Sequence, residues 1–222
     1  MQVETVASFS ELHDVLHSLK AKQMTIFRGQ RDAAWPIRTS VGRAKPSGRG
    51  TWEYMEARLL KLFKESAVPY APFEPKNDWE WLALGQHHGL PTRLLDWTYN
   101  PLTAAFFAVE EESDCDCAVY VFWGGRTMDP NKDTDPLNLK SVIRYRPPHV
   151  TMRIAGQAGL FTAHPKPTEP FEHRSMMKIE ITENCRSDIK KTLYKYGISR
   201  RTLFPGLDGI AADLHWLEAE KH

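Results

Sequence analysis

The sequence contains little cysteine, almost no net charge and no long hydrophobic run. Its three cysteines, Cys115, Cys117 and Cys185, are too few for a disulfide framework and match no zinc-ligand spacing. We therefore expect reduced thiols and no bound metal. The 29 basic side chains are balanced by 28 acidic ones, so the chain as a whole lacks the strongly basic composition of a dedicated nucleic-acid-binding protein.

Signals for membranes and export are also missing. No segment approaches the ~20 consecutive apolar residues of a transmembrane helix. The polar start from Met1 to Thr5 has neither the basic nor the apolar region of a signal peptide. We expect a soluble, cytoplasmic protein that does not contact a membrane. Its 222 residues suffice for one domain with a substantial core.

Several common catalytic motifs are absent as well. The sequence contains no G-x-S-x-G, no P-loop, no G-x-G-x-x-G and no H-E-x-x-H. These absences argue against a serine hydrolase, a P-loop nucleoside triphosphatase, a Rossmann dehydrogenase and a zinc protease. The cysteines have no evident activating partner in the sequence, so a cysteine nucleophile is not expected either.

Apolar spacing and capping residues predict several helices. Ser8 and Glu11 form a capping-box pattern ahead of apolar residues at helical spacing. Asn100-Pro101 is a second start signal, because asparagine caps a helix and proline suits its first position. The predicted helices begin at Ser8, cover 52–67, run from Asn77 or Asp78 to near Gly89, run from Pro101 to Val109, and cover 187–194 and 207–220.

Short runs rich in β-branched and aromatic residues predict strands. They cover 24–27, 118–123, 152–162 and 177–181. The polar segment 124–149, with several prolines, is predicted to be a long loop that is functional or mobile rather than core. No linker or internal repeat divides the chain. We therefore predict one α+β domain over residues 1–222, with a helical C-terminal part at 185–220.

One candidate site lies at Phe27-Arg28-Gly29-Gln30, where an arginine ends a predicted strand. The glycine after it lets the backbone turn sharply or a ligand approach closely. An arginine fixed at a strand end suits bidentate binding of a phosphate or a carboxylate. The alternative is an arginine that forms a salt bridge inside the protein.

A second candidate is the segment 85–98, which concentrates polar and aromatic side chains. Its two adjacent histidines point about 100° apart on a helix, so together they are poor ligands for one metal. Asp96 either pairs with Arg93, three residues away, or orients Arg28 or Arg93 toward an anion. Both interpretations stay open at this point.

Two further segments have unusual composition. Gln157 is flanked by small residues in a predicted strand, which suggests that another group comes close to the backbone; a bulge or a packing requirement explains the glycines equally well. The stretch from Arg38 to Arg49 has four basic side chains and no acidic one. It is either a solvated loop or a contact surface for nucleic acid.

Together these segments resemble the FRG domain family, which is named for the tripeptide found here as Phe27-Arg28-Gly29. The similarity extends well beyond that tripeptide. It continues through Gln30, Trp35, the run from Gln86 to Thr98, Asn100-Pro101-Leu102, residues 104–108 and residues 157–162. The resemblance covers about residues 20–165, with a weaker closing segment at 203–209.

FRG domains are similar to the ADP-ribosyltransferase fold and occur in bacterial and phage proteins. The resemblance therefore implies a mixed or antiparallel central sheet flanked by helices. It also implies that NAD is bound as a substrate, with Arg28 against its pyrophosphate. The residues implied to bind NAD are Phe27, Arg28, Gly29, Gln30, Thr92, Arg93 and Thr98, and those implied to serve catalysis or to order the pocket are Arg28, His88, Asp96 and Gln157.

The sequence departs from ADP-ribosyltransferases at the catalytic glutamate, because Gln157 stands where that residue is expected. A glutamine can hydrogen-bond a ribose hydroxyl, but it supplies no negative charge for a cationic transition state. The other carboxylates considered for this role are those of Glu169, Glu172, Glu180 and Asp208.

Three functions follow as expectations. The first is an NAD-binding protein that transfers ADP-ribose to a macromolecular acceptor or hydrolyses NAD, as a defence or toxin effector. The second is a non-catalytic module that recognises a nucleotide, a nucleic acid or a phage protein, with the loop from Arg38 to Arg49 as its contact surface. The third assigns Arg28 and Asp96 to a buried polar network that only stabilises the fold, so that substitution of either would unfold the protein.

Overall fold

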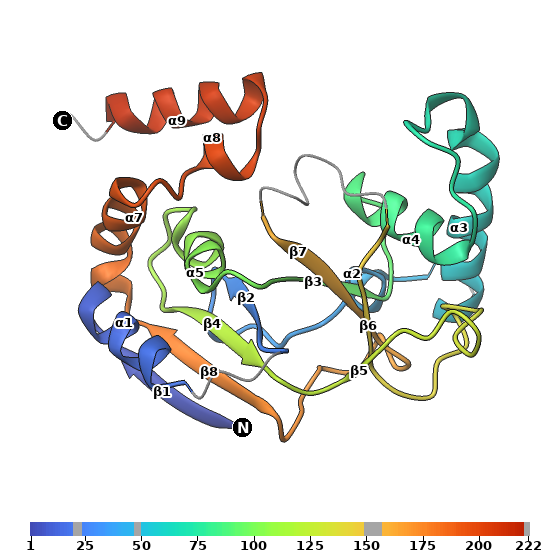
Figure 1. The fold of residues 1–222 in the computed structure, drawn as a ribbon, viewed down its shortest axis with the longest axis horizontal. Helices are drawn as coiled ribbons and strands as arrows, with labels where there is room; N and C mark the ends of the chain where they lie inside the picture. The colour runs from blue at the N-terminus through green and yellow to red at the C-terminus, as the bar shows by residue number, and fades with distance from the viewer. Residues whose placement is uncertain (20–23, 47–49, 149–156, 220–222) are drawn as a thin grey trace.

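The computed structural model describes residues 1–19, 24–46, 50–148 and 157–219 of the chain. They form an α+β structure around one eight-stranded sheet (Figure 1). The strands are β1 Gln2–Val6, β2 Ile26–Gln30, β3 Leu94–Thr98, β4 Cys117–Phe122, β5 Arg126–Thr127, β6 Ile143–Tyr145, β7 Gly159–Ala163 and β8 Met176–Ile181. Their order across the sheet is β1-β8-β4-β2-β3-β7-β6-β5.

The sheet is mixed in strand direction. Strands β1 and β8 are parallel, as are β5 and β6, and the other neighbouring pairs are antiparallel. The predicted α+β class with a mixed central sheet is therefore confirmed. Because β2, β3 and β4 come from separate parts of the chain, the centre of the sheet brings together residues that lie far apart in the sequence.

The helices stand in two groups at opposite ends of the sheet (Figure 1). One group covers the part of the sheet formed by β1, β8, β4 and β2, and the other lies beside β3, β7 and β6. The first group comprises α1 Phe9–Ser18, α5 Pro101–Val109, η2 Glu183–Cys185, α7 Arg186–Lys195, α8 Arg200–Leu203 and α9 Leu207–Ala219; the second comprises α2 Ser40–Arg43, α3 Trp52–Ala67, η1 Val68–Tyr70 and α4 Asp78–His87.

The expected capping residues begin three of these helices. The side chain of Ser8 accepts a hydrogen bond from the Glu11 N–H at the start of α1. At α4 the side chain of Asn77 accepts from a first-turn N–H in the same way. Asn100 does so at α5, where Pro101 occupies the first helical position. Each cap satisfies a backbone donor that the first turn leaves without an intrahelical partner, and this explains why these helix starts were predictable.

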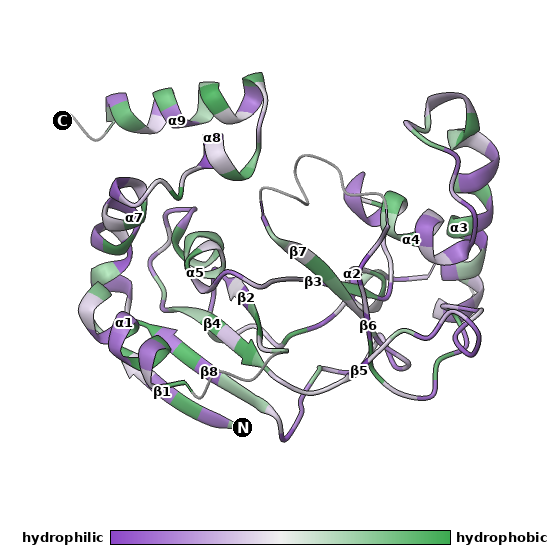
Figure 2. Cartoon of the chain, in the orientation of Figure 1, coloured by the Kyte–Doolittle hydropathy of each residue, from purple (hydrophilic) through white to green (hydrophobic). Residues whose placement is uncertain are grey.

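Separate apolar cores lie under the two groups of helices. Helix α5 is apolar almost throughout, and Phe106 and three alanines of this helix belong to the core that also holds residues of β4 and β8. Beneath α3 and α4, Leu60, Trp79 and Leu82 pack with Tyr145 and residues of β7. Figure 2 shows this pattern as green on the central strands and α5, with more purple on α3 and α7.

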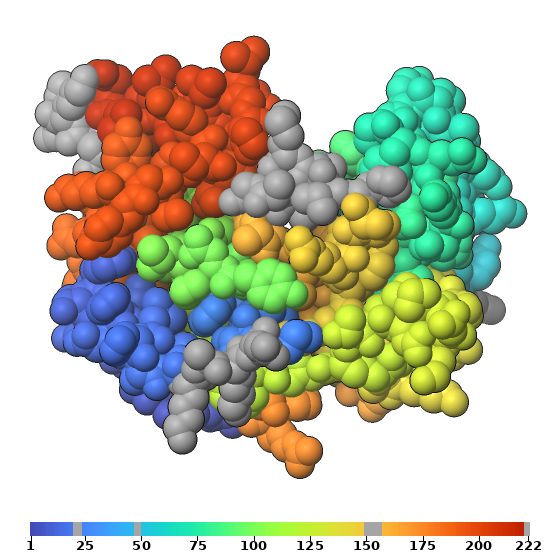
Figure 3. Space-filling model, viewed as in Figure 1, coloured from blue at the N-terminus to red at the C-terminus, as the bar shows by residue number. Residues whose placement is uncertain are grey.

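The two parts of the sheet are joined weakly at β2 and β3. Strand β2 pairs with β4 over five residues, and β3 pairs with β7 over five. Between β2 and β3 the only registered pair in the described structure is Phe27 with Thr98. The strands separate beyond that pair, and the side chain of Arg28 crosses the gap to the main-chain oxygen of Asp96, at 2.8 Å from Nη1. The molecule is correspondingly hollowed between the C-terminal helices and the region of α3 and η1 (Figure 3).

The sequence suggested that the strand ends at Gly29, but β2 does not end there. The strand continues through it to Gln30, and helix α5 passes directly over it. A Cβ atom at this position would overlap the carbonyl oxygen of Ala104 and lie 2.6 Å from the nitrogen of Ala108. Gly29 is therefore required for close packing of a helix on a strand.

Other strand predictions also need correction. Strands β1 and β3 were not predicted from apolar patterning, and the strand expected over 152–162 is β7 from Gly159, with its first part outside the described residues. Segment 124–149 is mostly irregular in its described part, but it contributes β5 and β6 to the sheet. Ile143 and Tyr145 of β6 are buried, so this segment adds to the core that the sequence did not assign to it.

The helix predictions at 52–67, 187–194 and 207–220 are confirmed by α3, α7 and α9 within one residue or two. The three cysteines have free thiols. Across residues 1–19, 24–46, 50–148 and 157–219, none of the helices combines the length and the apolar character needed to cross a membrane.

The packing of α5 over β2 predicts that Gly29→Ala is destabilising. The new methyl group would meet rigid backbone atoms of α5, so helix and strand must move apart. We expect the free energy of unfolding to fall by about 1–3 kcal/mol, measured by urea denaturation. The exposed loop substitution Ala34→Gly is the control and should change stability by less than about 0.5 kcal/mol. Equal stability of the Gly29→Ala variant would contradict the close approach.

Candidate functional site

A pocket of about 780 Å³ opens where β2 and β3 separate. This volume lies within the range of about 300–1,000 Å³ that is usual for small-molecule sites. Its walls come from β2, the loop that follows β2, α2, the end of α4, β3, the end of α5 and β7. The lining residues are Phe27, Arg28, Gly29, Gln30, Arg31, Trp35, Pro36, Arg38, Arg43, Gln86, His87, Asp96, Trp97, Thr98, Phe107, Glu110, Glu111, Gln157, Gly159, Leu160 and Phe161.

Arg28 lines this pocket, and its guanidinium has hydrogen-bonding capacity that the described residues do not use. Its Nη1 donates to the Asp96 main-chain oxygen at 2.8 Å and lies 3.9 Å from the Asp96 carboxylate. Its Nε is buried and has no hydrogen-bond partner among the described residues. Burial lowers the pKa of Arg28, the carboxylate of Asp96 opposes this, and the nearby charge of Arg43 lowers it further. A buried donor without a partner is costly, so the site favours an acceptor from a ligand.

A chain of side chains fixes Asp96 beside Arg28. The hydroxyl of Thr92 donates to Gln86 Oε1 at 2.6 Å, and Gln86 Nε2 donates to Asp96 Oδ2 at 2.9 Å. Thr92 is fully buried and is itself anchored by Ser40 of α2, whose hydroxyl accepts from the Thr92 N–H at 2.9 Å. The bond to Gln86 therefore orients the carboxylate, which explains why Gln86 and Thr92 belong to one motif with Asp96.

Arg38, which precedes α2, and Arg43, the last residue of α2, line the same pocket. The Nε of Arg38 is the second buried arginine nitrogen without a partner in the described chain, and Arg43 donates to the main-chain oxygen of Arg38. Helix α2 is tightly held, because Thr39 donates to the Pro167 carbonyl at 3.1 Å and a Cβ on Gly42 would overlap that same carbonyl oxygen. The basic stretch is therefore not one solvated loop: two of its four cations line the pocket.

The lining carries an excess of positive charge. The charged lining residues are Arg28, Arg31, Arg38, Arg43, Asp96, Glu110 and Glu111. Arg31 is paired with Glu111, and Glu110 is paired with Arg200 of α8. Three arginines then remain against one aspartate, which is a net excess of two positive charges (three minus one) within the described part of the pocket, with histidine neutral. An enclosed excess of this kind attracts an anion.

The far wall of the pocket depends on the C-terminal part of the chain. Gln157 lies just before β7. Its side-chain Nε2 donates to the Leu203 carbonyl of α8 at 3.1 Å. Its main-chain carbonyl accepts a hydrogen bond from Thr98 Oγ1 at 2.6 Å. Glu110 is mostly buried, and burial raises its pKa while the charge of Arg200 opposes the shift. Gln157 and Glu110 thus connect the pocket to α8.

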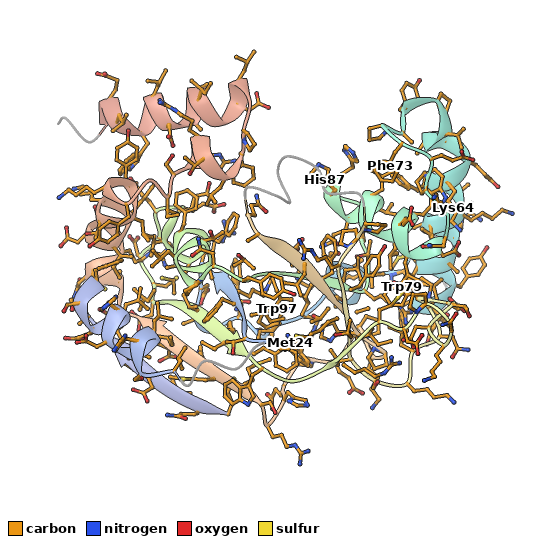
Figure 4. All side chains as sticks on the ribbon, in the orientation of Figure 1. Met24, Lys64, Phe73, Trp79, His87 and Trp97 are labelled. Atoms are coloured by element: carbon orange, nitrogen blue, oxygen red, sulfur yellow. The ribbon has the colours of Figure 1, made fainter. Side chains whose placement is uncertain are left out.

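The structure brings together most, but not all, of the residues expected at the site. Phe27, Arg28, Gly29, Gln30, Asp96, Thr98 and Gln157 line one pocket. His88 does not: it is the exposed C-cap of α4, and its neighbour His87 lines the pocket instead. Figure 4 labels His87 at the end of α4 and Trp97 near the centre of the sheet. Thr92 does not line the pocket either; it contacts the lining residue Gln86 through its hydroxyl.

Arg93 is a structural residue rather than a ligand-binding one. Its guanidinium forms a buried ion pair with Glu56 of α3, at 2.6 Å between Nη2 and Oε2, and both side chains are at most 3% exposed. It also donates to the Leu137 carbonyl at 2.9 Å and lies over the Trp52 ring. Arg93 thereby joins β3 to α3 and to segment 124–149. It does not pair with Asp96, which settles one alternative that the sequence left open.

The carboxylates considered in place of Gln157 lie outside the pocket. Glu169 pairs with Lys166 and Glu180 with Lys178, while Glu172 and Asp208 are exposed elsewhere. The acidic residues that do line it are Asp96, Glu110 and Glu111. The sequence did not indicate that Glu110 and Glu111 line the pocket, because they look like the charged end of an apolar helix. Only the fold brings the end of α5 to the arginines.

Residues 23–117 match the family model of the FRG domain. This segment of the chain resembles FRG domains. The matched segment supplies β2, α2, α4, β3 and α5, and hence every charged residue of the pocket lining. No curated protein and no solved structure matches the chain. Among the residues that the structure describes, no group of three or more histidine, cysteine, aspartate or glutamate residues is arranged to hold a metal.

The buried Arg93–Glu56 pair leads to a stability prediction. Glu56→Ala leaves the Arg93 guanidinium buried without its counter-charge, so we expect a loss of about 3–5 kcal/mol in the free energy of unfolding. Glu65→Ala on the same helix is the matched control, because Glu65 is exposed and lies 3.9 Å from Lys61. Its cost should be below about 1 kcal/mol. Urea denaturation of both variants tests this, and equal costs would refute the structural role of Arg93.

A second prediction concerns pH and the floor of the pocket. Trp97 Nε1 donates to Thr162 Oγ1 at 2.7 Å, and Thr162 Oγ1 lies 2.8 Å from His164 Nε2, so the hydroxyl keeps its own proton to donate to an unprotonated Nε2. Burial lowers the pKa of His164 to about 3, with smaller effects from Arg28 and Arg93. Below pH ~6.5, His164 therefore becomes protonated in the unfolded chain but stays neutral in the folded protein.

The stability contributed by neutral His164 is thus complete above pH ~6.5 and is lost as the pH falls toward 3. Within this pH range, His164 lowers the free energy of unfolding by about 1.4 kcal/mol for each pH unit of acidification. Urea denaturation at pH 7 and pH 5 should show a steeper decline for the wild type than for His164→Gln, which keeps an acceptor but does not titrate. Parallel declines would show that His164 titrates normally in the folded protein.

Proposed function

We propose that the pocket binds NAD and that the protein uses it as a donor of ADP-ribose. The observation that carries this proposal is the excess positive charge on Arg28, Arg38 and Arg43, two of which have a buried Nε without a partner in the described structure. A pyrophosphate, with one negative charge on each phosphate, balances that excess and offers acceptors to both nitrogens.

The shape of the site supports a ligand of this size. A volume of about 780 Å³ has room for a dinucleotide, and the pocket runs from the exposed loop after β2 to the buried floor at Trp97. The resemblance to ADP-ribosyltransferases likewise implies an arginine on a strand that is placed against the NAD phosphates. We extend the proposal to an ADP-ribosyltransferase-like arrangement of the sheet.

The proposed reaction breaks the bond between the ribose C1′ and the nicotinamide nitrogen. The acceptor, a macromolecular nucleophile or water, forms the new bond to C1′ and loses its proton, and nicotinamide leaves. Arg28 would hold the pyrophosphate, Asp96 would keep Arg28 in place, and Thr98 and Gln157 would lie beside the ribose. A carboxylate of the lining would stabilise positive charge on the ribose ring.

A non-catalytic module for nucleotide recognition is the second candidate. One observation bears on it directly: Arg38 and Arg43 line the pocket together with Arg28. The basic stretch therefore supports a small phosphorylated ligand better than an extended nucleic-acid surface. Binding without turnover would favour this candidate.

The first test is calorimetric titration of NAD into the purified protein and into Arg28→Ala. Loss of a charge-assisted contact to phosphate should weaken binding about 10- to 100-fold. Lys45→Ala is the matched control, since Lys45 belongs to the same basic stretch but does not line the pocket, and its affinity should equal that of the wild type. Circular dichroism shows whether each variant is folded.

Arg43→Ala gives an independent measurement, because Arg43 is exposed and its removal leaves the Arg28 contacts intact. It should also weaken NAD binding. If the wild type does not bind NAD at millimolar concentration, the proposal is wrong. A folded Arg28→Ala that binds as well as the wild type would place the pyrophosphate elsewhere.

Turnover is tested by following nicotinamide release from NAD by chromatography. We expect release by the wild type and a loss of at least tenfold in Arg28→Ala, because the pyrophosphate contact positions the scissile bond. Saturable binding with no release, alone or with a cell extract as a source of acceptors, would identify a recognition module instead.

A further inference from the structure

Trp35 is an exposed aromatic side chain at the mouth of the arginine-lined pocket. It is 46% exposed, although it contributes to the pocket wall. The other large exposed aromatics of the described chain lie outside this wall: Tyr54, Tyr70, Tyr99 and Tyr196. Because the indole is exposed where it borders the pocket, it can present a large, rigid aromatic surface to a bound ligand.

The loop that carries Trp35 is held in one conformation. Gln30 Nε2 donates to the Trp35 carbonyl at 2.6 Å and to the Asp32 carbonyl at 3.1 Å. The Ala34 N–H donates to the Asp32 carboxylate at 2.8 Å, and the Ala33 N–H donates to the Asp116 carbonyl at 2.8 Å. The indole therefore stands on a fixed backbone, which reduces the entropy that a ligand would lose on stacking there.

Arg31 covers part of the Trp35 ring. The guanidinium carbon lies 4.8 Å from the ring centroid, and Arg31 is held by its ion pair with Glu111. The buried side chain of Arg186 fixes the backbone below this pair, since it donates to the carbonyls of Arg31 and Glu111 at 2.7 and 2.8 Å. With Arg31 on one side and nearly half the residue still exposed, the indole offers a ring surface to a planar group.

We propose that the purine base of the ligand stacks on Trp35 while its phosphates contact Arg28, Arg38 and Arg43. This inference rests on the proposed function, in which the base is the adenine of NAD. The chain order supports it, because only Pro36 and Ile37 separate Trp35 from Arg38, and Ile37 is buried and accepts from the Phe171 N–H at 2.7 Å. One anchored segment thus presents both an aromatic surface and a phosphate ligand.

The same placement sets the direction of the dinucleotide. Trp35 is exposed, whereas Trp97, Thr98 and Phe161 at the other end of the lining are buried. The reacting bond is favoured at the enclosed end, where fixed protein groups replace bulk water around the developing charge, so the nicotinamide lies toward Trp97 and Thr98. The adenine then occupies the open end at Trp35.

The inference is tested with Trp35→Ala and Trp35→Phe, titrated calorimetrically with NAD, ADP and inorganic pyrophosphate. Loss of a stacking contact should weaken NAD and ADP about 5- to 100-fold in Trp35→Ala and leave pyrophosphate unchanged. Trp35→Phe should recover part of the affinity. Tyr70→Ala removes an exposed aromatic outside the pocket and should bind all three ligands like the wild type.

The outcomes separate this inference from the proposed function. Unchanged ADP affinity in a folded Trp35→Ala would overturn the stacking site, and so would an equal loss for ADP and pyrophosphate, which would indicate that Trp35 only supports the arginines. If the wild type binds ADP with the expected dependence on Trp35 but does not bind NAD, the base site stands and the NAD proposal fails. If it binds no adenine nucleotide at millimolar concentration, both are overturned.

Discussion

The guanidinium of Arg28 occupies the gap at the centre of the sheet, where β2 and β3 part after a single registered pair in the described structure. It hydrogen-bonds a main-chain carbonyl that would otherwise face the opening, and in doing so it holds a positive charge where the chain has few carboxylates to balance it. The opening between the strands and the charge within it therefore have one cause. The pocket exists because the sheet is interrupted, and it is electropositive because an arginine bridges the interruption.

Several surrounding features keep that interruption in place. Helix α5 lies so close over Gly29 that β2 cannot move toward it, and the buried pair of Arg93 and Glu56 ties β3 to α3 on the other side. The hydrogen bond from Thr92 orients the side chain of Gln86, and Gln86 in turn donates to the carboxylate of Asp96. The strands that border the gap are thus each fixed from outside it, and this packing together with the contact of Arg28 across the gap preorganises the site.

Local signals accounted for much of the fold. Caps at Ser8, Asn77 and Asn100 and the apolar spacing of α3 are properties of neighbouring residues, and they were legible in the sequence. Strand β3 was not, because it alternates buried and exposed positions only weakly and its polar residues serve the site. The role of Gly29 was also misjudged, since a sequence does not reveal that a helix some 75 residues later passes over it. The arginine at position 28 was identifiable by type, whereas Glu110, Arg31 and the inward direction of Arg38 depend on tertiary contacts.

The charge excess has a consequence for ionic strength. Three arginines that share a pocket with the single carboxylate of Asp96 repel one another, as the effect of Arg43 on the pKa of Arg28 indicates. Dissolved salt weakens this repulsion and also weakens the attraction of the pocket for the proposed dianionic ligand. Added salt should therefore stabilise the ligand-free protein and lower its affinity for that ligand, so that the increase in melting temperature on binding becomes smaller as salt is raised.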